Sequence, residues 1–585
     1  MCSDSPAGFA ETDALVRDYF DRGGQPAISY GVVSGGTLVH SAGFGARFLG
    51  GPPPDTGTVF RIASMSKSFT ASAIMLLRDE GVLALDDLAE KYVPELAGWR
   101  PAAPDSDRMT IRHLLTMTAG FPTDDPWGDR QQGLPLEAFA SLLAGGVRVN
   151  WAPGTRFEYS NLGYAILGRV ITAVSGRPYH EFVRDRLLRP LGMARSGFEA
   201  AEFGPQDLAR GYRRGPEGWE ELTPDGCGAF APMGGVFSCV TDLARWVSGL
   251  AGAFPPGEPG TGGAHPLARA SRREMQLPHM MLTPPAPARL PGEPASGGPV
   301  GYGFGLFVEE HPVQGRVTSH SGGYPGFGSH MRWHLETGTG VIVLANSTYA
   351  STHTLGARLL DAVLAGSAPA RAADYAASPP GPWPATLAAQ RAANKLLYSW
   401  SDARADQLFA ENAALDETYP ERRHRIALVQ ERIGVFAEDK KRPAEFDSPA
   451  QCRWWLRGDQ GAVQAEIRLT PERDPRVQSF TLAVPPADGT PLGRVLASLI
   501  SLLNDGARDW PPALPVSSGV DTAVLLRQFR MAGAWAGRCR PGAFRSGNGE
   551  RSTTVELDGE TARLVLAVVL DAAGQLRQAD VTLSP

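Results

Sequence analysis

One stretch near the N-terminus places a serine and a lysine at helical spacing in an otherwise apolar segment. Residues 60–70 read Phe-Arg-Ile-Ala-Ser-Met-Ser-Lys-Ser-Phe-Thr, so Ser64 and Lys67 lie three positions apart. No glycine or proline occurs between Ser64 and Glu80, and Gly81 follows as a C-terminal stop. Apolar residues cover nearly the whole circumference of this predicted helix, which indicates that it is buried. A lysine in the first turn of a buried helix needs an explanation, because an unpaired buried ammonium is costly.

A serine nucleophile with a neighbouring base would explain this pair. Residues three apart share one helix face, so the Lys67 amine can reach the Ser64 hydroxyl. A free serine is a poor nucleophile and needs such a base, and burial lowers a lysine pKa from about 10.4 toward neutrality. Ser64 also lies at a helix start, where free N–H groups favour developing negative charge. Taken alone, the pattern also fits a helix N-terminus with a chance serine and lysine.

Length and charge describe a globular chain of several domains. With 585 residues the chain exceeds one hydrophobic core, so two or three domains are expected. Hydrophobic residues make up 43% and charged residues 20%, which suits an ordinary folded protein. The net charge of -6 and the lack of a basic run argue against a nucleic-acid partner.

The cysteines and the apolar segments predict a cytoplasmic protein without a membrane or metal partner. The five cysteines form no CxxC pair and no metal spacing, so reduced thiols are expected. The N-terminal segment has neither a basic start nor an apolar core. The longest apolar stretches, 495–503 and 564–570, are too short to span a bilayer. No metal or organic cofactor is expected.

Two further short motifs follow the serine–lysine pair along the chain. Tyr159-x-Asn161 precedes a helix that apolar periodicity predicts over 162–174. Residues 320–323, His-Ser-Gly-Gly, are predicted to end a strand in a glycine pair. Each motif alone has a structural explanation: Asn161 as a helix N-cap, Tyr159 as a half-buried aromatic, and the histidine as a strand-end residue with one hydrogen bond.

Together and in this order, the motifs resemble those of the penicillin-binding-protein and class C β-lactamase superfamily of serine hydrolases. The resemblance runs from about residue 10 to about residue 365. It is supported by segments around the motifs: 60–67, Pro153-Gly154, Tyr164, Pro190-Leu191-Gly192-Met193, Gly234-Gly235 and Thr241-Asp242-Leu243. The resemblance implies an α/β fold of the α+β kind, with an antiparallel sheet flanked by helices and a helical subdomain.

The resemblance also implies roles for the motif residues. Ser64 would attack a carbonyl and form an acyl-enzyme. Lys67 and Tyr159 would share the general acid and base work, and which of them takes the serine proton is left open. Asn161 would hold Lys67 and the substrate amide by hydrogen bonds. The N–H groups of Ser64 and Gly323 would form the oxyanion hole.

The third motif departs from the pattern of many relatives, which carry Lys-Thr-Gly there and use its positive charge to bind a substrate carboxylate. His320-x-Gly322 is similar instead to the esterase and D-aminopeptidase branches. Histidine with an unperturbed pKa of about 6.5 is mostly neutral at pH 7, so a strong requirement for a substrate carboxylate is not expected. Met117 stands where relatives usually have histidine, and a packing role is expected for it.

Composition shifts divide the chain into a hydrolase domain and an accessory region. The predicted hydrolase domain covers 1–368, including a Gly/Pro-rich excursion over 251–300, and a linker follows over 369–384. Residues 385–585 are predicted to form a smaller α+β region, in which a weak repeat indicates two units, 385–485 and 486–585. Three roles are considered for this region: roofing the cleft, setting substrate size, or forming a homodimer.

The expected function is hydrolysis of an ester or amide bond through an acyl-Ser64 intermediate. The substrate would be a small molecule or a peptide: a small ester, a D-amino-acid amide or peptide, or a β-lactam-like ring. Two alternatives remain open. One is a biosynthetic acyltransferase or peptide cyclase that uses the same acyl-enzyme. The other is a protein that is acylated without turnover, or a catalytically silent scaffold.

Overall fold

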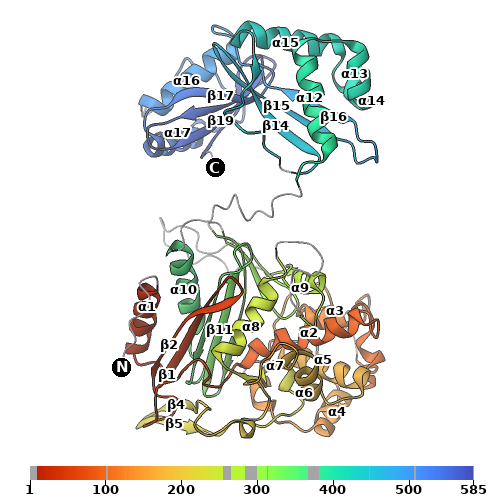
Figure 1. Ribbon diagram of the computed structural model, residues 1–585, viewed down its shortest axis with the longest axis vertical. Coiled ribbons are helices and arrows are strands. Elements are labelled where there is room, and N and C mark those ends of the chain that lie inside the picture. The colour runs from red at the N-terminus through yellow and green to blue at the C-terminus, as the bar shows by residue number, and fades with distance from the viewer. Residues whose placement is uncertain are drawn as a thin grey trace. The chain divides into compact units, whose positions relative to one another are not determined.

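The computed structural model describes residues 9–99, 103–125, 127–254, 265–282, 299–311, 314–366, 381–446, 448–505 and 509–583. The chain divides into two compact units, Met1–Ala377 and Ser378–Pro585, each with its own sheet (Figure 1). The boundaries predicted at 368 and 384 stay a prediction, because most of the predicted linker lies outside the described residues. The same holds for much of the excursion predicted over 251–300.

An eight-stranded antiparallel sheet forms the centre of the first unit. Its strands, in spatial order, are β2 (Thr37–Gly45), β1 (Ala27–Ser34), β12 (Gly340–Ala345), β11 (Phe327–His334), β10 (Gly315–Tyr324), β9 (Phe307–His311), β8 (Val300–Tyr302) and β7 (Met280–Met281). The N-terminal hairpin β1–β2 joins the sheet by pairing β1 with β12. The sequence predicts two strands, over 27–33 and 37–44, joined by a turn at Ser34-Gly35-Gly36. The structure confirms this hairpin, and both glycines take the positive φ that such a turn requires.

Helices cover both faces of this sheet (Figure 1). Helices α1 (Ala10–Asp21) and α10 (Thr352–Gly366) pack together on one face, and α8 (Val240–Ala251) packs on the other. The side chains of β12 alternate between the two cores, because successive residues of a strand point to opposite faces. Val341 and Val343 join the core under α1 and α10, whereas Ile342 and Leu344 join the core under α8.

A helical region adjoins the sheet and contains the serine–lysine helix. Its helices are α2 (Ser66–Asp79), α3 (Ile111–Leu115), α4 (Leu136–Ala144), α5 (Asn161–Ser175), α6 (Tyr179–Val183) and α7 (Ala231–Gly234). Helix α2 is buried from Ser66 to Leu77, as its apolar circumference predicts. The ring of Phe69 stacks on Trp246 of α8 with centroids 3.8 Å apart, and the Trp246 indole N–H donates to the Ser68 hydroxyl at 3.0 Å. These contacts hold α2 against α8.

Short elements complete the first unit. They are the strand pairs β3 (Phe60–Arg61) with β6 (Phe237–Ser238) and β4 (Gly211–Gly215) with β5 (Gly218–Leu222), helix α9 (Arg269–Met275), a π-helical turn at Arg184–Leu188, and 3-10 turns at Ala63–Met65, Ala89–Lys91, Pro94–Leu96, Gly128–Gln131 and Ala200–Glu202. The pair β3–β6 ends directly before the first of these turns, so it places the candidate nucleophile between the sheet and α2.

A second sheet forms the centre of the C-terminal unit. Its order is β13 (Ala437–Glu438), β14 (Gln451–Gly458), β15 (Gly461–Leu469), β17 (Arg540–Ser546), β18 (Ser552–Asp558), β19 (Arg563–Leu570) and β20 (Leu576–Leu583), and β16 (Val477–Leu482) also pairs with β15. Strands β15 and β17 run parallel and join the two halves of this sheet. The helices are α12 (Pro384–Tyr398), α13 (Asp402–Leu408), α14 (Glu411–Asp416), α15 (Tyr419–Ile433), α16 (Pro491–Asp505) and α17 (Thr522–Ala536).

Two hydrophobic cores lie in this unit, one under α12–α15 and one under α16 and α17. The sequence after the predicted linker has no strong break and predicts one helix over roughly 385–412. This prediction is wrong, because the segment is divided into α12, α13 and α14. One break falls at Phe409, whose extended backbone forms a bridge with Val477 of β16. Strand β17 was not predicted, because Pro541 and Gly542 weaken its strand signal.

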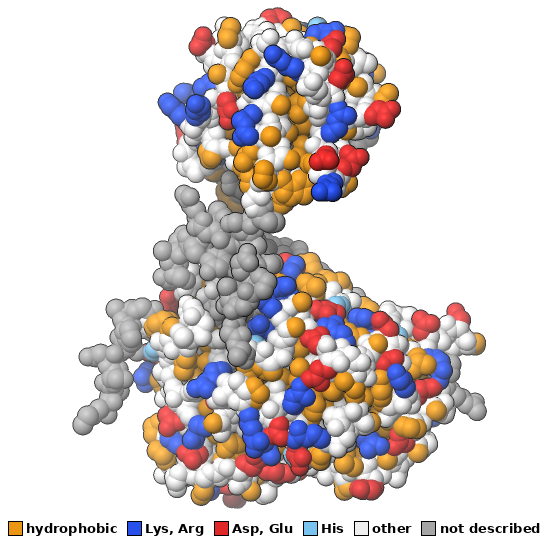
Figure 2. Space-filling model, turned by 45° about the vertical axis from the view of Figure 1, so that its right-hand side comes forward, with side chains coloured by type: hydrophobic (Ala, Val, Ile, Leu, Met, Phe, Trp, Pro, Cys, Tyr) orange, Lys and Arg blue, Asp and Glu red, His pale blue; other side chains and the backbone are white. Residues whose placement is uncertain are grey.

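Surface charge is mixed on the faces that Figure 2 displays, where Lys and Arg side chains lie among Asp and Glu side chains on each unit. The four cysteines among the described residues, Cys227, Cys239, Cys452 and Cys539, carry free thiols. Of the helices that the structure describes, none combines the length and hydropathy that a bilayer crossing requires.

Candidate active site

Ser64 lies in the 3-10 turn Ala63–Met65, and the α-helix that carries Lys67 begins only at Ser66. The preceding residue, Ala63, has a φ of +48°, a left-handed conformation that residues with a side chain rarely adopt. The chain therefore turns sharply just before Ser64. The neighbouring Ser66 is occupied elsewhere, because its hydroxyl accepts the N–H of Val236 at 3.0 Å.

The ammonium group of Lys67 is fully buried and has three partners. Its Nζ donates to Ser64 Oγ at 2.9 Å, to Asn161 Oδ1 at 2.7 Å and to the Met233 carbonyl at 3.0 Å. These three acceptors satisfy all three N–H groups of an ammonium. The lysine is therefore fixed with its nitrogen against the Ser64 hydroxyl.

Burial lowers the pKa of Lys67 from 10.5 to about 8, while the nearby carboxylates of Asp125, Asp129 and Asp124 raise it. At pH 7 such a lysine is uncharged in about a tenth of the molecules. The uncharged amine has a lone pair at hydrogen-bond distance from the serine hydroxyl. The pair can therefore perform base catalysis near neutral pH.

The phenol of Tyr159 is a second proton-carrying group beside Ser64. Its ring centroid lies 4.8 Å from Lys67 Nζ, and the ring is parallel to that of Phe307. Burial raises the pKa of Tyr159 well above 10, Asp125 raises it further, and a hydrogen bond with Ser64 lowers it. Tyr159 is therefore a neutral phenol at pH 7, able to donate a proton.

Asn161 is positioned by two neighbouring carboxylates. Asp125 accepts a hydrogen bond from Asn161 Nδ2, which leaves the amide oxygen turned toward Lys67. Asp124 accepts the first two backbone N–H groups of α5 at 2.6 Å and 2.7 Å. The N-cap of α5 is Ser160, whose side chain accepts from Gly163, so Asn161 is not a capping residue.

His320 is buried on β10, with its ring centroid 6.4 Å from that of Tyr159. Its Nδ1 lies 2.6 Å from the Ser321 carbonyl oxygen, and its Nε2 lies 3.3 Å from the Tyr302 hydroxyl. A carbonyl only accepts, so Nδ1 carries the proton and the Tyr302 hydroxyl donates to Nε2. Burial, and secondarily Lys67, lowers the pKa of His320 from 6.5 to about 3. The third motif thus supplies no positive charge at neutral pH.

The sequence predicts that strand β10 ends at the glycine pair. This prediction is wrong, because β10 continues through both glycines to Tyr324. Gly322 makes this possible because a Cβ there would lie 2.2 Å from the Ile62 carbonyl oxygen and 3.0 Å from Ala63 Cβ. Glycine therefore lets the strand pass directly against the turn that carries Ser64.

The edge of β10 beside Ser64 is free of a strand partner. Strand β11 pairs along Val317–Tyr324, whereas β9 pairs only along Gly315–Ser319. Tyr324 and Phe327 close a two-residue hairpin turn as a hydrogen-bonded pair, so the next pair inward does not exchange hydrogen bonds. The N–H of Gly323 therefore points away from β11, toward the free edge, where it can meet an oxyanion.

A cavity of about 470 Å³ opens at this place. It is lined by Ser64, Asp125, Asp129, Tyr159, Phe307, His320, Ser321, Gly323 and Tyr349. Of the residues predicted from the sequence, Ser64, Tyr159, His320 and Gly323 line it. Lys67 and Asn161 support Ser64 from behind, and Gly322 lies against the Ser64 turn.

Five lining residues were not predicted as site residues: Asp125, Asp129, Phe307, Ser321 and Tyr349. Asp125 and Asp129 come from the loop after α3, Phe307 starts β9, and Tyr349 follows β12. The adjacent pair Asp124-Asp125 is an unusual local feature, but it does not show which residue it approaches. Among the residues that the structure describes, no cluster of three or more His, Cys, Asp or Glu side chains could hold a metal ion.

Met117 has the packing role expected for it. It is buried and adopts a φ of +58°. Its sulfur accepts the Ser160 N–H at 3.4 Å, and its carbonyl accepts the Glu158 N–H at 2.9 Å. Met117 therefore positions the segment that carries Tyr159.

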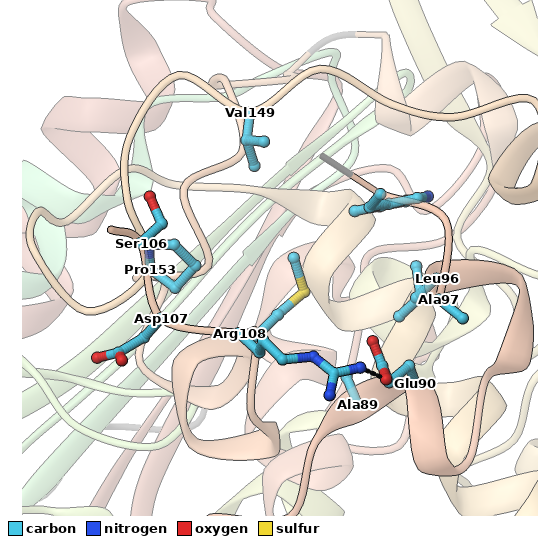
Figure 3. A pocket seen from close by; sticks show the side chains of 11 residues that line it. Ala89, Glu90, Leu96, Ala97, Ser106, Asp107, Arg108, Val149 and Pro153 are labelled. Atoms are coloured by element: carbon cyan, nitrogen blue, oxygen red, sulfur yellow. Dashed lines mark ion pairs between the residues drawn. The ribbon is translucent and has the colours of Figure 1, made fainter. Parts of the chain in front are cut away.

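A second hollow, of about 120 Å³, lies elsewhere in the helical region and shares no lining residue with the Ser64 cavity. Figure 3 shows the side chains of Arg108 and Glu90 meeting there, and these two form an ion pair. The hollow is also lined by Asp107, and it contains none of the residues predicted for the site.

The first unit is similar in sequence to known proteins. Residues 12–365 match the model of the family described as Beta-lactamase. Penicillin-binding protein 4* of Bacillus subtilis (strain 168) is 27% identical over 331 residues, covering 53% of this chain and 66% of that protein. Protein flp of Staphylococcus aureus (strain MW2) is 26% identical over 339 residues, covering 57% and 62%. The chain thus spans about two thirds, or less, of these relatives.

Solved structures share the fold. The octameric penicillin-binding protein homologue from Pyrococcus abyssi is 23% identical with a TM-score of 0.50, covering 81% of this chain and 95% of that one. A class C beta-lactamase is 19% identical with a TM-score of 0.50, covering 62% and 97%. The first unit therefore has a β-lactamase/transpeptidase-like fold of the α+β class.

Proposed function

The chain belongs to the beta-lactamase family, and on that premise we propose that it is a serine hydrolase that cleaves an ester or amide bond through an acyl-Ser64 intermediate. The observation that carries the proposal is the 2.9 Å hydrogen bond between Lys67 Nζ and Ser64 Oγ. It joins a nucleophile to an amine whose pKa burial lowers to about 8. Other members of the family are serine hydrolases, which agrees with this chemistry.

Acylation in this proposal begins with the uncharged form of Lys67. The amine takes the proton of the Ser64 hydroxyl as Oγ attacks the carbonyl carbon. The N–H groups of Ser64 and Gly323 stabilise the negative charge on the carbonyl oxygen. Tyr159, a neutral phenol, then protonates the leaving group and regains a proton from Lys67. Asn161 keeps the Lys67 nitrogen against Ser64 throughout.

Deacylation reverses these roles. Water attacks the acyl carbonyl, the amine of Lys67 accepts the proton of that water, and the resulting ammonium protonates Ser64 Oγ as it leaves. The neutral state of His320 gives the site no cation there for a substrate carboxylate. We therefore expect esters and amides to be better substrates than peptides that are recognised by a free C-terminal carboxylate.

Cytoplasmic location and self-association remain proposals. The described cysteines are free thiols, which suits a reducing compartment. The homologue from Pyrococcus abyssi, which aligns with 81% of this chain, is described as octameric. We propose that this chain also forms oligomers, beginning with a homodimer.

Intact-mass spectrometry after exposure to a fluorophosphonate and, separately, to a penicillin tests the proposed nucleophile. We expect wild type to gain one fluorophosphonate adduct and Ser64→Ala to gain none, because only Ser64 is activated by Lys67. Ser66→Ala is the matched control, since the Ser66 hydroxyl already accepts a hydrogen bond from Val236, and it should label like wild type.

The two reagents separate the substrate classes. An adduct with both would direct screening to β-lactams and peptides, and an adduct with the fluorophosphonate alone would direct it to plain esters. A burst without turnover would favour a protein that is acylated and retained, and a new amide formed with an added amine would favour an acyltransferase. No adduct with either reagent would contradict the proposed function.

The pH profile should report the ionisation of Lys67. We expect kcat/KM for a neutral ester to rise with pH and reach half its maximum near pH 8, because the uncharged amine is the active form. Asp129 raises the pKa of Lys67, so Asp129→Asn should move the midpoint to lower pH by roughly one unit. Glu181→Gln, an exposed carboxylate on α6, is the control and should leave the midpoint unchanged. A midpoint that Asp129→Asn does not lower would contradict this assignment.

A further inference from the structure

The ionisable carboxyl groups that line the Ser64 cavity have no lysine or arginine among their lining neighbours. Of the nine lining residues of the cavity, Asp125 and Asp129 are the carboxylates. Burial raises the pKa of Asp129 to about 6, which still leaves it ionised in most molecules at pH 7. Lys67 lies behind Ser64 and is fully buried, and His320 is neutral. A substrate that enters this cavity therefore meets two carboxylates and no lining cation.

One oxygen of each carboxylate is available to a substrate. Asp129 is only 2% exposed, and its Oδ2 accepts the Tyr349 hydroxyl at 2.8 Å. Asp125 Oδ1 accepts from Asn161 Nδ2. Over the part of the chain that the structure describes, Asp129 Oδ1 and Asp125 Oδ2 have no hydrogen-bond partner. Asp125 is exposed, whereas Asp129 is buried, and a buried carboxylate is stabilised by a cation brought to it.

Two chains of direct contacts connect these carboxylates to the reacting centre. Ser64 contacts Lys67, whose Nζ contacts Asn161, whose amide contacts Asp125. On the other side, the ring of Tyr349 covers Gly323 so closely that a Cβ there would lie 2.8 Å from Tyr349 Cδ1. The hydroxyl of the same tyrosine holds Asp129. Along these contacts, Asp129 lies one side chain away from the position of the oxyanion, and Asp125 lies two side chains away from the nucleophile.

Aromatic rings complete a surface suited to a cation. Tyr159, Phe307 and Tyr349 line the same cavity, and the faces of such rings attract ammonium groups. Tyr349 has a φ of +51°, an uncommon conformation for a residue with a side chain. This backbone conformation places the ring between Gly323 and Asp129, so Tyr349 acts as a positioning residue for Asp129.

We propose that Asp129 and Asp125 select substrates that carry an ammonium group close to the scissile carbonyl, which makes aminoacyl esters and amides with a free amino group the preferred substrate class. The inference rests on the proposed hydrolase function and names its acyl group. It assigns Asp129 and Asp125 as specificity determinants and leaves the bond-breaking steps unchanged.

The same carboxylates also raise the pKa of Lys67, so the rate with one substrate does not isolate their effect on specificity. A ratio of two substrates does. The effect on Lys67 is common to both substrates and cancels in the ratio, whereas an attraction for the ammonium group affects only the charged one.

The experiment compares 4-nitrophenyl esters in which an ammonium group replaces a methyl group. Because the ammonium group also activates the carbonyl, each kcat/KM is divided by the rate constant for hydrolysis of the same ester by hydroxide. The 3-aminopropanoyl ester is matched with the butanoyl ester, and the alanyl ester of each hand with the 2-methylpropanoyl ester, so that ammonium replaces methyl. We expect wild type to show at least a tenfold higher normalised kcat/KM for the ammonium member of a pair. Asp129→Asn and Asp125→Asn should each reduce this preference severalfold, and the double variant should bring it near one. Glu181→Gln should keep the wild-type ratio.

Outcomes separate this inference from the proposed function. Turnover of neutral esters with no preference for the ammonium member, or a preference that survives the double variant, would overturn the inference and leave the hydrolase intact. Failure of wild type to react with a fluorophosphonate would overturn both. Where a variant loses turnover, protection of Ser64 from labelling by 3-aminopropylboronic acid is compared with protection by butylboronic acid. We expect such a variant to lose the preference for the aminoalkyl compound, as its kinetic preference would be lost. This measurement is possible without turnover because it requires only binding and adduct formation.

Discussion

Lys67→Ala is expected to lower kcat/KM by at least a hundredfold for every ester or amide that the protein hydrolyses, in the range of 10²–10⁴ that a general base usually contributes. Its Nζ contacts the Ser64 hydroxyl at 2.9 Å, and the residues that line the cavity include no lysine that could replace it. Tyr159 cannot replace it as a resting base, because burial holds the pKa of that phenol well above 10. Steady-state kinetics with a neutral 4-nitrophenyl ester measures the loss.

Two controls separate chemistry from stability. Removing Lys67 leaves the Asn161 amide oxygen and the Met233 carbonyl without their partner, which costs about 1–3 kcal/mol. Thermal melting must therefore show that the variant is folded at the assay temperature. Lys67→Arg keeps a positive charge but does not deprotonate, so it should be as inactive as Lys67→Ala. Wild-type rates in either folded variant would refute the role of Lys67 as the base.

The main elements of the first unit follow from local sequence patterns. The apolar circumference of the 66–79 segment predicts a buried helix, and α2 is buried throughout its first three turns. The order of the three motifs led to the family, which the match over residues 12–365 confirms. Such features are accessible because periodicity and motif spacing are properties of contiguous residues.

Other features depend on distant residues and could not be read locally. A glycine pair predicts a strand end, yet β10 continues through it because Gly322 fits against Ile62, which is far away in the sequence. The helix predicted over 385–412 is interrupted where Phe409 bridges to Val477. In both cases a tertiary contact outweighs the local preference of the chain.

The sequence did not predict that two carboxylates, Asp125 and Asp129, line the cavity, because this also depends on distant residues. Asp125 lies in an irregular loop and Asp129 in the 3-10 turn Gly128–Gln131, and nothing in their local pattern indicates that they approach Ser64. Their position follows from Asp124, which accepts the first two N–H groups of α5, and from Tyr349, which follows β12 and donates to Asp129. The sequence therefore predicted the groups that perform the proposed chemistry better than the groups that select its substrate.

Tyr159→Phe is expected to lower kcat/KM at least a hundredfold for amides and alkyl esters, and much less for 4-nitrophenyl esters. The substitution keeps the ring that packs against Phe307 and beneath Lys67, and it removes only the hydroxyl. An amine or alkoxide must be protonated as it leaves, whereas 4-nitrophenolate leaves as a stable anion. A residue that acts as a general acid for the leaving group therefore matters most for the poor leaving groups.

The dependence on the leaving group determines which proton Tyr159 moves. A loss confined to amides and alkyl esters places the phenol at the departing group and leaves Lys67 as the base toward Ser64. An equal loss on 4-nitrophenyl esters would instead mean that Tyr159 takes part in removing the Ser64 proton, with Lys67 tuning it through the contact at 4.8 Å. Unchanged rates for both ester classes would exclude Tyr159 from the chemistry. Phe307→Leu, which alters the packing against the same ring without removing a proton donor, should give a smaller loss that does not vary with the leaving group.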